Sequence, residues 1–200
     1  NKKCDANFFQ HGPYLDQYNK MFENDLVNVA SIFYVPFAIY LSKSKSEVFN
    51  KTHDLSKVLS GARVAIPDNA ISETRSIKLL SANNVLKFKQ SNSAPGLDDV
   101  ESNPYAVVIY KVDGSVIPQM LSNDNVDVAV MNAGSANLLG FKLNQATFVE
   151  NNSATYANIL VSRKDNANSA KIKALKNALQ SPEVKQYIQH KYGNLVVPAF

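Results

Sequence analysis

The stretch DANFFQHGPYLDQY, residues 5–18, decides the fold of this 200-residue chain. An apolar, strand-like run ends at His11, and Gly12-Pro13 then breaks it. Apolar side chains recur at helical spacing after the break, which predicts a helix. A polar tip with aromatic neighbours, where a strand gives way to a helix, is where open α/β sheets bind small molecules. The stretch therefore predicts an α/β fold with a small-molecule site beside His11.

Strand-like and helix-like segments alternate along the rest of the chain. The predicted strands are residues 27–40, 62–66, 106–110, 126–131 and 157–161, and the predicted helices are residues 55–59, 73–82, 115–121, 172–179 and 182–192. Residues 42–54 are polar and are expected to be an exposed connector. Pro36 marks an edge, a bulge or a crossing between lobes. The alternation predicts a mostly parallel sheet, or two of them.

Composition describes a globular chain and argues against nucleic acid as a partner. The chain is 45% hydrophobic and 19% charged, which suffices for a sizeable core. No run approaches the ~20 apolar residues of a membrane span. The net charge of +4 comes from lysines spread along the chain, without a basic stripe interleaved with aromatic side chains. We therefore expect no nucleic-acid binding.

The sequence suggests neither a cofactor nor a metal. Cys4 is the single cysteine, so no internal disulfide is expected, and no Cys/His spacing is typical of a metal site. Because no apolar signal segment precedes Cys4, we interpret it as a buried strand thiol and not as a lipid acceptor. The seven glycines are scattered, so no phosphate-binding loop is predicted.

Catalytic patterns are also missing from the sequence. His11 lacks a recognisable nucleophilic partner, and neither Ser nor Cys stands in a nucleophile-elbow pattern. We therefore predict that the protein is not an enzyme. A hydrolase or transferase remains the alternative if His11 has a nucleophilic or acidic partner.

Arg75 is a charged side chain at an unusual position, near the start of a predicted helix. If Ser72 caps the predicted helix, Arg75 lies in its first turn, where a cation opposes the helix dipole at a cost of about 0.3–1 kcal/mol. Such an arginine fits a site where a carboxylate or phosphate docks. The alternative is an exposed arginine paired with Glu73 or Asp68. Spacing alone leaves both readings open.

Two asparagines stand where predicted strands end or return. Asn132 directly follows one strand, and Asn158 opens another, beside Tyr156. Amide side chains in such places can donate to and accept from a zwitterion. The alternative for each asparagine is a plain turn residue.

The chain resembles the methionine-binding lipoprotein family of bacterial ABC importers (NlpA/MetQ type) over nearly all of its length. The resemblance rests on motifs in matching order, at residues 5–15, 35–40, 65–75, 126–132, 156–158, 181–192 and 197–200. It implies a two-lobed, periplasmic-binding-protein-like (type II) α/β fold with the ligand in a cleft. The first lobe would hold residues 1–41 and 157–200, and the second would hold residues 42–156.

The resemblance also implies a ligand site and roles for its side chains. Arg75 would clamp the ligand's α-carboxylate, while amides hold the carboxylate and ammonium and aromatic side chains form a wall. The implied site residues are Phe9, His11, Tyr14, Arg75, Asn132, Tyr156 and Asn158.

The same resemblance implies a place in the cell and partners. The chain would deliver methionine to an ABC permease and its ATPase, held at the cell envelope by a lipid anchor upstream of residue 1. A surface antigen or adhesin of the same fold, or an effector-binding regulatory domain, is the alternative.

Some residues depart from the family pattern. Ser72 replaces an asparagine, Asn69-Ala70 replaces Asp-Pro, and residues 132–136 lack an aromatic. The expected ligand is therefore methionine or a similar apolar amino acid, dipeptide or sulfur compound. The family's first strand, helix and second strand do not precede residue 5 in this sequence. If the protein truly lacks them, an open sheet edge is expected.

Overall fold

The chain crosses twice between two units of structure. A computed structural model describes residues 3–89, 94–151 and 153–200. One unit comprises Asn1–Pro36 and Asn151–Phe200, and the other comprises Phe37–Glu150. Pro36 thus stands at a crossing between units, one of the three readings its ring suggested. The lobe boundaries proposed from the sequence, 41/42 and 156/157, stay a prediction.

The first unit contains a four-stranded antiparallel sheet. Its order is β1-β10-β2-β11, with β1 (Ala6–His11), β10 (Asn158–Arg163), β2 (Leu26–Tyr34) and β11 (Val197–Pro198). Every neighbouring pair is antiparallel, so the prediction of a mostly parallel sheet is wrong here. β1 and β2 do run parallel to each other, as a strand-helix-strand unit requires, but β10 returns from far along the sequence and lies between them.

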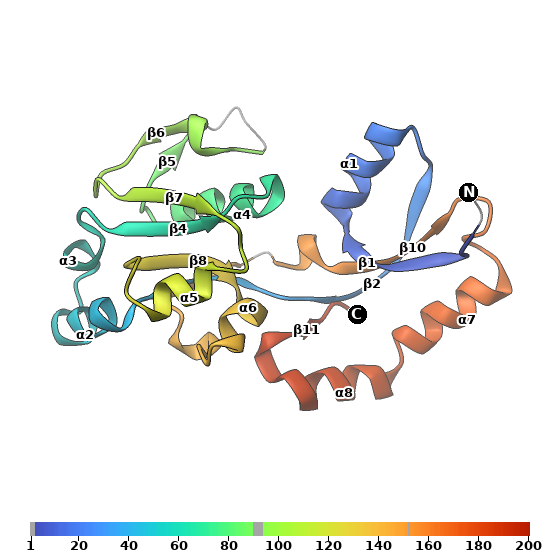
Figure 1. The fold of residues 1–200 in the computed structure, drawn as a ribbon. Coiled ribbons are helices and arrows are strands. Elements are labelled where there is room, and N and C mark those ends of the chain that lie inside the picture. The colour runs from blue at the N-terminus through green and yellow to red at the C-terminus, as the bar shows by residue number, and fades with distance from the viewer. Residues whose placement is uncertain (1–2, 90–93, 152) are drawn as a thin grey trace. The chain divides into compact units, whose positions relative to one another are not determined.

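Helices cover both faces of this sheet (Figure 1). α1 (Gly12–Phe22) places Leu15 against Ile159 and Val161. Leu179 of α7 (Ala170–Leu179) packs on the opposite face, against Leu160. The two helices meet opposite faces because neighbouring side chains of β10 alternate. α8 (Pro182–Tyr192) follows and contacts β11.

The second unit contains a five-stranded mixed sheet, in the order β7-β4-β8-β3-β9. Its strands are β3 (Phe37–Leu41), β4 (Arg63–Pro67), β7 (Val108–Val112), β8 (Val128–Asn132) and β9 (Phe148–Val149). β4 is parallel to β7 and β8, whereas β3 is antiparallel to β8 and β9. The parallel prediction therefore holds for three of these strands only.

Helices sandwich the second sheet as well (Figure 1). α4 (Ala70–Ala82) packs Ile77 and Leu80 on one face. α5 (Ile117–Ser122) and α6 (Ala133–Leu138) cover the other. A small separate sheet pairs β5 (Lys87–Phe88) with β6 (Val100–Ser102). Short 3-10 turns occupy Leu97–Asp99, Leu143–Gln145, Ser153–Tyr156 and Gly193–Leu195.

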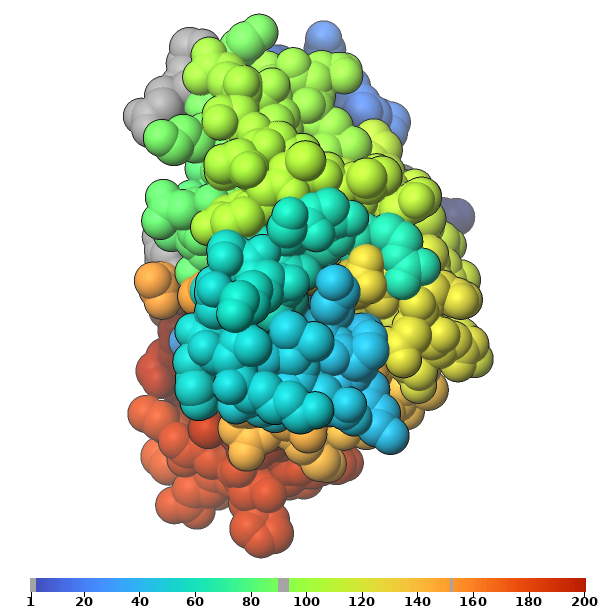
Figure 2. Space-filling model, turned by 90° about the vertical axis from the view of Figure 1, so that its left-hand side faces the viewer, coloured from blue at the N-terminus to red at the C-terminus, as the bar shows by residue number. Residues whose placement is uncertain are grey.

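The connector predicted at residues 42–54 is wrong, because most of it is helical. Ser42 accepts a hydrogen bond from the backbone N–H of Lys45 and so caps α2 (Lys43–Thr52). Phe49 of α2 packs against the core, although the segment is otherwise polar. α3 (Leu55–Leu59) follows as predicted, and Figure 2 shows both helices on one face of this unit.

Two further predictions need correction. Asn69 caps α4, since its Oδ1 accepts from the backbone N–H of Ser72 at 3.0 Å, so Ser72 is not the cap. Arg75 therefore lies beyond the first turn of α4, and the helix-dipole argument does not apply to it. Cys4 is exposed, because β1 begins only at Ala6.

Tyr40 carries an unusual polar group in the core of the second unit. The side chain is 1% exposed and packs edge-on against Phe141, with ring centroids 6.0 Å apart. Its hydroxyl has no hydrogen-bond partner among the described residues. Burial raises the pKa of Tyr40 to about 12.

Tyr40→Phe should therefore raise the free energy of unfolding at neutral pH by about 1 kcal/mol, since an unsatisfied buried polar group costs about 1–3 kcal/mol. Below pH ~10, where an unfolded tyrosine titrates, the hydroxyl is protonated in both states. From there to about pH 12 only the unfolded state ionises, so Tyr40 lowers stability as the pH rises.

The phenylalanine variant should lose less stability over that alkaline range, as denaturant melts at several pH values would measure. Tyr110→Phe, at an exposed tyrosine of the same unit, is the matched control. A Tyr40→Phe protein that is less stable than the parent at neutral pH would contradict this account.

Candidate functional site

The carboxyl ends of β4 and β8 lie at the same edge of the second sheet. Parallel strands place their carboxyl ends together, and ligands of open α/β sheets bind at such edges. Asn69 follows β4 and caps α4, and Asn132 ends β8 and caps α6. β3 begins beside them, because Phe37 pairs with Asn132 in the antiparallel register. Helices α4 and α6 thus both begin at the edge where Arg75 is expected to act, and their first backbone N–H groups lie there.

Arg75 is buried here and pairs with an acidic side chain that the sequence reading did not consider. Its Nε donates to Oε1 of Glu150 at 3.2 Å, and its Nη2 donates to Oε2 at 2.5 Å. The guanidinium carbon also lies 4.1 Å from the centroid of the Phe37 ring. Arg75 is 7% exposed, so the reading of an exposed arginine paired with Glu73 or Asp68 is wrong.

Glu73 has a different role in the same helix. Its Oε1 accepts from the backbone N–H of Leu97 at 3.0 Å, and its Oε2 pairs with the ammonium of Lys111 at 2.9 Å. That hydrogen bond and the charge of Glu73 raise the pKa of Lys111. Glu73 therefore fixes the turn at residues 96–99 and leaves Arg75 to Glu150.

Asn132 uses its amide to start α6. Its Oδ1 accepts from the backbone N–H of Ser135 at 2.8 Å, and its Nδ2 donates to the hydroxyl of Ser135 at 2.9 Å. The side chain is half-buried beside the start of β3. Its position at the edge agrees with the sequence, but its hydrogen bonds are those of a helix cap.

The remaining predicted residues lie together in the first unit. His11 ends β1 and caps α1, because its Nδ1 accepts from the backbone N–H of Tyr14 at 3.2 Å. The His11 ring meets Tyr14 and Tyr156 edge-on, with ring centroids 6.4 Å and 5.8 Å away. The structure thus brings three predicted aromatic residues into contact, although Tyr156 is far from His11 and Tyr14 in the sequence.

Phe9 and Asn158 complete this group. The amide nitrogen of Asn158 donates to the carbonyl of Phe9, which ties the tip of β1 to β10. The Phe9 ring is 75% exposed, and Tyr14 is 46% exposed. Apolar rings at this exposure, fixed on a strand and a helix, are suited to contact an apolar ligand.

The seven predicted residues therefore fall into two groups. Five lie in the first unit, and Arg75 and Asn132 lie in the second. Sequence reasoning missed Phe37 and Glu150, which contact Arg75. Only their places beside the two crossings between units, directly after Pro36 and before Asn151, could have drawn attention to them.

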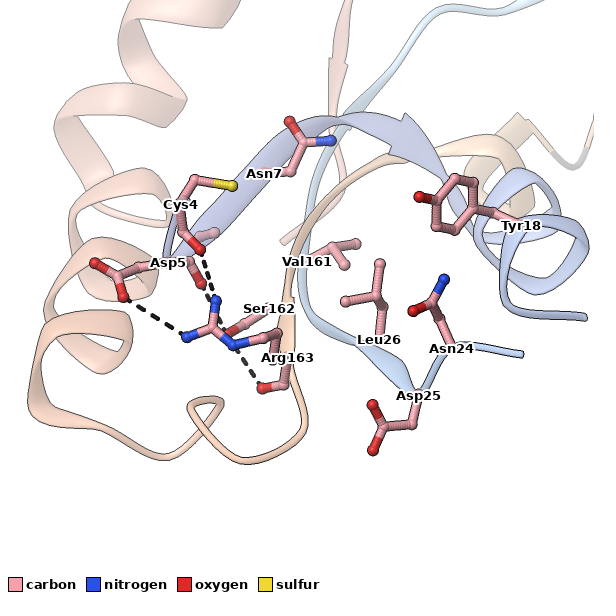
Figure 3. A pocket seen from close by; sticks show the side chains of 11 residues that line it. Cys4, Asp5, Asn7, Tyr18, Asn24, Asp25, Leu26, Val161, Ser162 and Arg163 are labelled. Carbon is pink, nitrogen blue, oxygen red and sulfur yellow. Dashed lines mark hydrogen bonds and ion pairs between the residues drawn. The ribbon is translucent and has the colours of Figure 1, made fainter. Parts of the chain in front are cut away.

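Two surface hollows lie among the described residues of the first unit. One of about 240 Å³ lies between β1 and α1 and is lined by Phe9, Tyr14 and Tyr18, among others. The other, of about 260 Å³, is more polar and surrounds the start of β1 (Figure 3). There Arg163 donates to the carbonyl of Cys4 at 2.6 Å, and Lys171 pairs with Asp5 at 2.7 Å, which lowers the pKa of Asp5. Internal pairs thus balance much of the charge at this second hollow.

The described residues lack two kinds of feature. Residues 3–89, 94–151 and 153–200 hold no group of three or more His, Cys, Asp or Glu side chains arranged to bind a metal ion. In the same ranges, every helix is too short or too polar to cross a membrane.

Comparison with known proteins places this geometry in context. A family model described as NlpA lipoprotein matches residues 1–200. The probable D-methionine-binding lipoprotein MetQ of Pasteurella multocida is 35% identical over 195 residues, which cover 96% of this chain and 67% of that protein.

Solved structures agree with the sequence comparison. A YaeC-family lipoprotein of Enterococcus faecalis has a TM-score of 0.88 at 28% identity, covering 99% of this chain and 80% of that one. A nutrient-binding protein of Burkholderia cenocepacia, solved bound to methionine, has a TM-score of 0.82 at 29% identity, covering 98% and 79%. The predicted fold class, that of periplasmic substrate-binding proteins, is confirmed.

The cap at His11 gives a test of how the first group is built. His11→Ala should lower the free energy of unfolding by about 1 kcal/mol, because the N-terminal N–H groups of α1 lose an acceptor. His11→Asn keeps a capping oxygen and should retain most of that stability. Denaturant melts of the three proteins measure this, and equal losses in both variants would contradict a capping role.

Proposed function

Because the chain belongs to the NlpA lipoprotein family, we propose that it is a solute-binding protein that captures methionine or a close analogue outside the cytoplasm and delivers it to an ABC importer. The observation that carries the proposal is the family match over residues 1–200. The likeness to a protein solved with methionine supports the choice of ligand. In this proposal the protein performs no chemistry and works by binding alone.

The side chains described above fit the parts of such a ligand. A buried guanidinium suits a carboxylate, since charge-assisted hydrogen bonds are the strong ones. Aromatic rings suit a thioether, at about 0.3–1.5 kcal/mol for each sulfur contact. We propose that Arg75 binds the α-carboxylate and that Asn132 and Asn158 bind the carboxylate and ammonium. Phe9, His11, Tyr14 and Tyr156 would then surround the side chain of the ligand.

The proposal extends to partners and place in the cell. Relatives are named as lipoproteins, and one solved relative, from Coxiella burnetii, is a periplasmic substrate-binding protein of an ABC transporter. We propose a permease and its ATPase as partners, and a lipid anchor that holds the protein at the cell envelope. Its ligand-loaded form would then be the form that the permease recognises.

Arg75→Ala should weaken methionine binding by more than tenfold, because hydrogen bonds to charged groups contribute about 1.5–3 kcal/mol each. Isothermal calorimetry with both enantiomers of methionine, and with a panel of amino acids and dipeptides, measures the effect. The thermal midpoint of each variant must be recorded, since the change leaves Glu150 buried without its partner.

Arg63→Ala is the matched control for this experiment. Arg63 also pairs with a carboxylate in the second unit, that of Asp127, but at the opposite end of β4. Its loss should leave methionine affinity unchanged. If the Arg75→Ala protein is folded and its affinity for methionine is unchanged, the assignment of Arg75 to the carboxylate site is contradicted.

A further inference from the structure

Glu150 holds the Arg75 guanidinium along one defined edge. Oε1 accepts from Nε and Oε2 accepts from Nη2, so the carboxylate and guanidinium meet in a side-on, two-point pair. The side chain of Glu150 is 14% exposed and that of Arg75 is 8% exposed. In such a shielded place the pair fixes the direction of the guanidinium much more firmly than a surface ion pair would.

Phe37 contacts both members of this pair, Arg75 through its ring and Glu150 through its backbone. Its ring lies under the guanidinium, 4.1 Å from the guanidinium carbon. Its backbone N–H donates to Oε2 of Glu150 at 3.5 Å, and its carbonyl accepts from the backbone N–H of Glu150 at 2.9 Å. One face and one edge of the guanidinium are therefore contacted by the residues at the two ends of the second unit.

We propose that Glu150 is a positioning residue for Arg75 and so determines how well the protein recognises a ligand carboxylate. This inference rests on the proposed function. A guanidinium carries five donors in a rigid fork. Because Glu150 takes the edge formed by Nε and Nη2, a ligand carboxylate would meet the guanidinium from another side. Because Glu150 already orders the long side chain, binding a ligand costs less conformational entropy.

The opposite reading is that Glu150 competes with the ligand for Arg75, and the contacts disfavour it. Glu150 directly follows β9, and its backbone N–H donates to the carbonyl of Phe37, so the backbone that carries its carboxylate is held beside Arg75. Charge gives a second argument. Arg75 and Glu150 together are neutral, so a zwitterionic ligand adds no net charge to a buried place.

Glu150→Gln tests the inference, because glutamine keeps the shape but not the charge of the side chain. Two probes are titrated by calorimetry: methionine, and methioninol, which lacks the carboxylate. We expect the variant to bind methionine about tenfold more weakly and methioninol almost as the parent does, since hydrogen bonds to charged groups lose strength when one charge is removed. The preference for methionine over methioninol should fall accordingly.

Asp127→Asn serves as the matched control. It removes the charge of another carboxylate that binds an arginine in the same unit, that of Arg63. It should leave the preference between the two probes unchanged. A purely structural role of Glu150 would weaken both probes alike, and competition would make Glu150→Gln bind methionine more tightly. Either result would overturn the inference.

A ligand-free measurement separates this inference from the proposed function. The Nε–H of Arg75, assigned in side-chain NMR spectra by its loss in Arg75→Lys, should exchange slowly with water in the parent and much faster in Glu150→Gln. Equal exchange rates would overturn the inference even if methionine binds. If the parent binds no methionine, the proposed function fails, and the exchange rates still decide whether Glu150 positions Arg75.

Discussion

The ion pair between Arg75 and Glu150, which lies over the ring of Phe37, is the interaction on which the order of the proposed ligand-binding edge of the second unit depends. It joins α4 to the residue that opens β3 and to the residue that follows β9. These last two are also the first and last residues of the unit. Removing one partner would leave a buried charge uncompensated, at a cost of about 3–5 kcal/mol. Both points where the chain enters and leaves the unit are therefore tied to one side chain.

The two units contribute different chemistry to the proposed recognition of an amino acid. The first offers rings held at a strand tip and a helix start, where His11 both caps α1 and meets Tyr14 and Tyr156. The second offers a buried guanidinium that pairs with Glu150 and lies over the ring of Phe37. Apolar contact and charge recognition are thus built on separate sheets, and each sheet fixes its own side chains through local hydrogen bonds.

Much of this fold could be predicted from the sequence, because strands and helices leave periodic patterns. The turn at Gly12-Pro13 and the break at Pro36 were readable for the same reason: both residues restrict the backbone. Strand direction was not readable, since β10 enters the first sheet between β1 and β2 from more than a hundred residues away. The helix α2 was missed because its sequence is mostly polar and shows no clear apolar periodicity, although Phe49 packs on the core.

The site was predictable to a similar degree. A family resemblance pointed to Arg75, but no local pattern could reveal its partner, since Glu150 lies 75 positions away and only folding brings the two together.

The central claim, that this protein binds methionine or a close analogue, is tested most directly by identifying what it already carries. Protein purified without added ligand would be denatured, and the released small molecules identified by mass spectrometry. The account predicts methionine, or an analogue with a free α-carboxylate, in an amount comparable to the protein. Release of no such compound, together with no thermal shift from methionine, its enantiomer or related dipeptides, would contradict it.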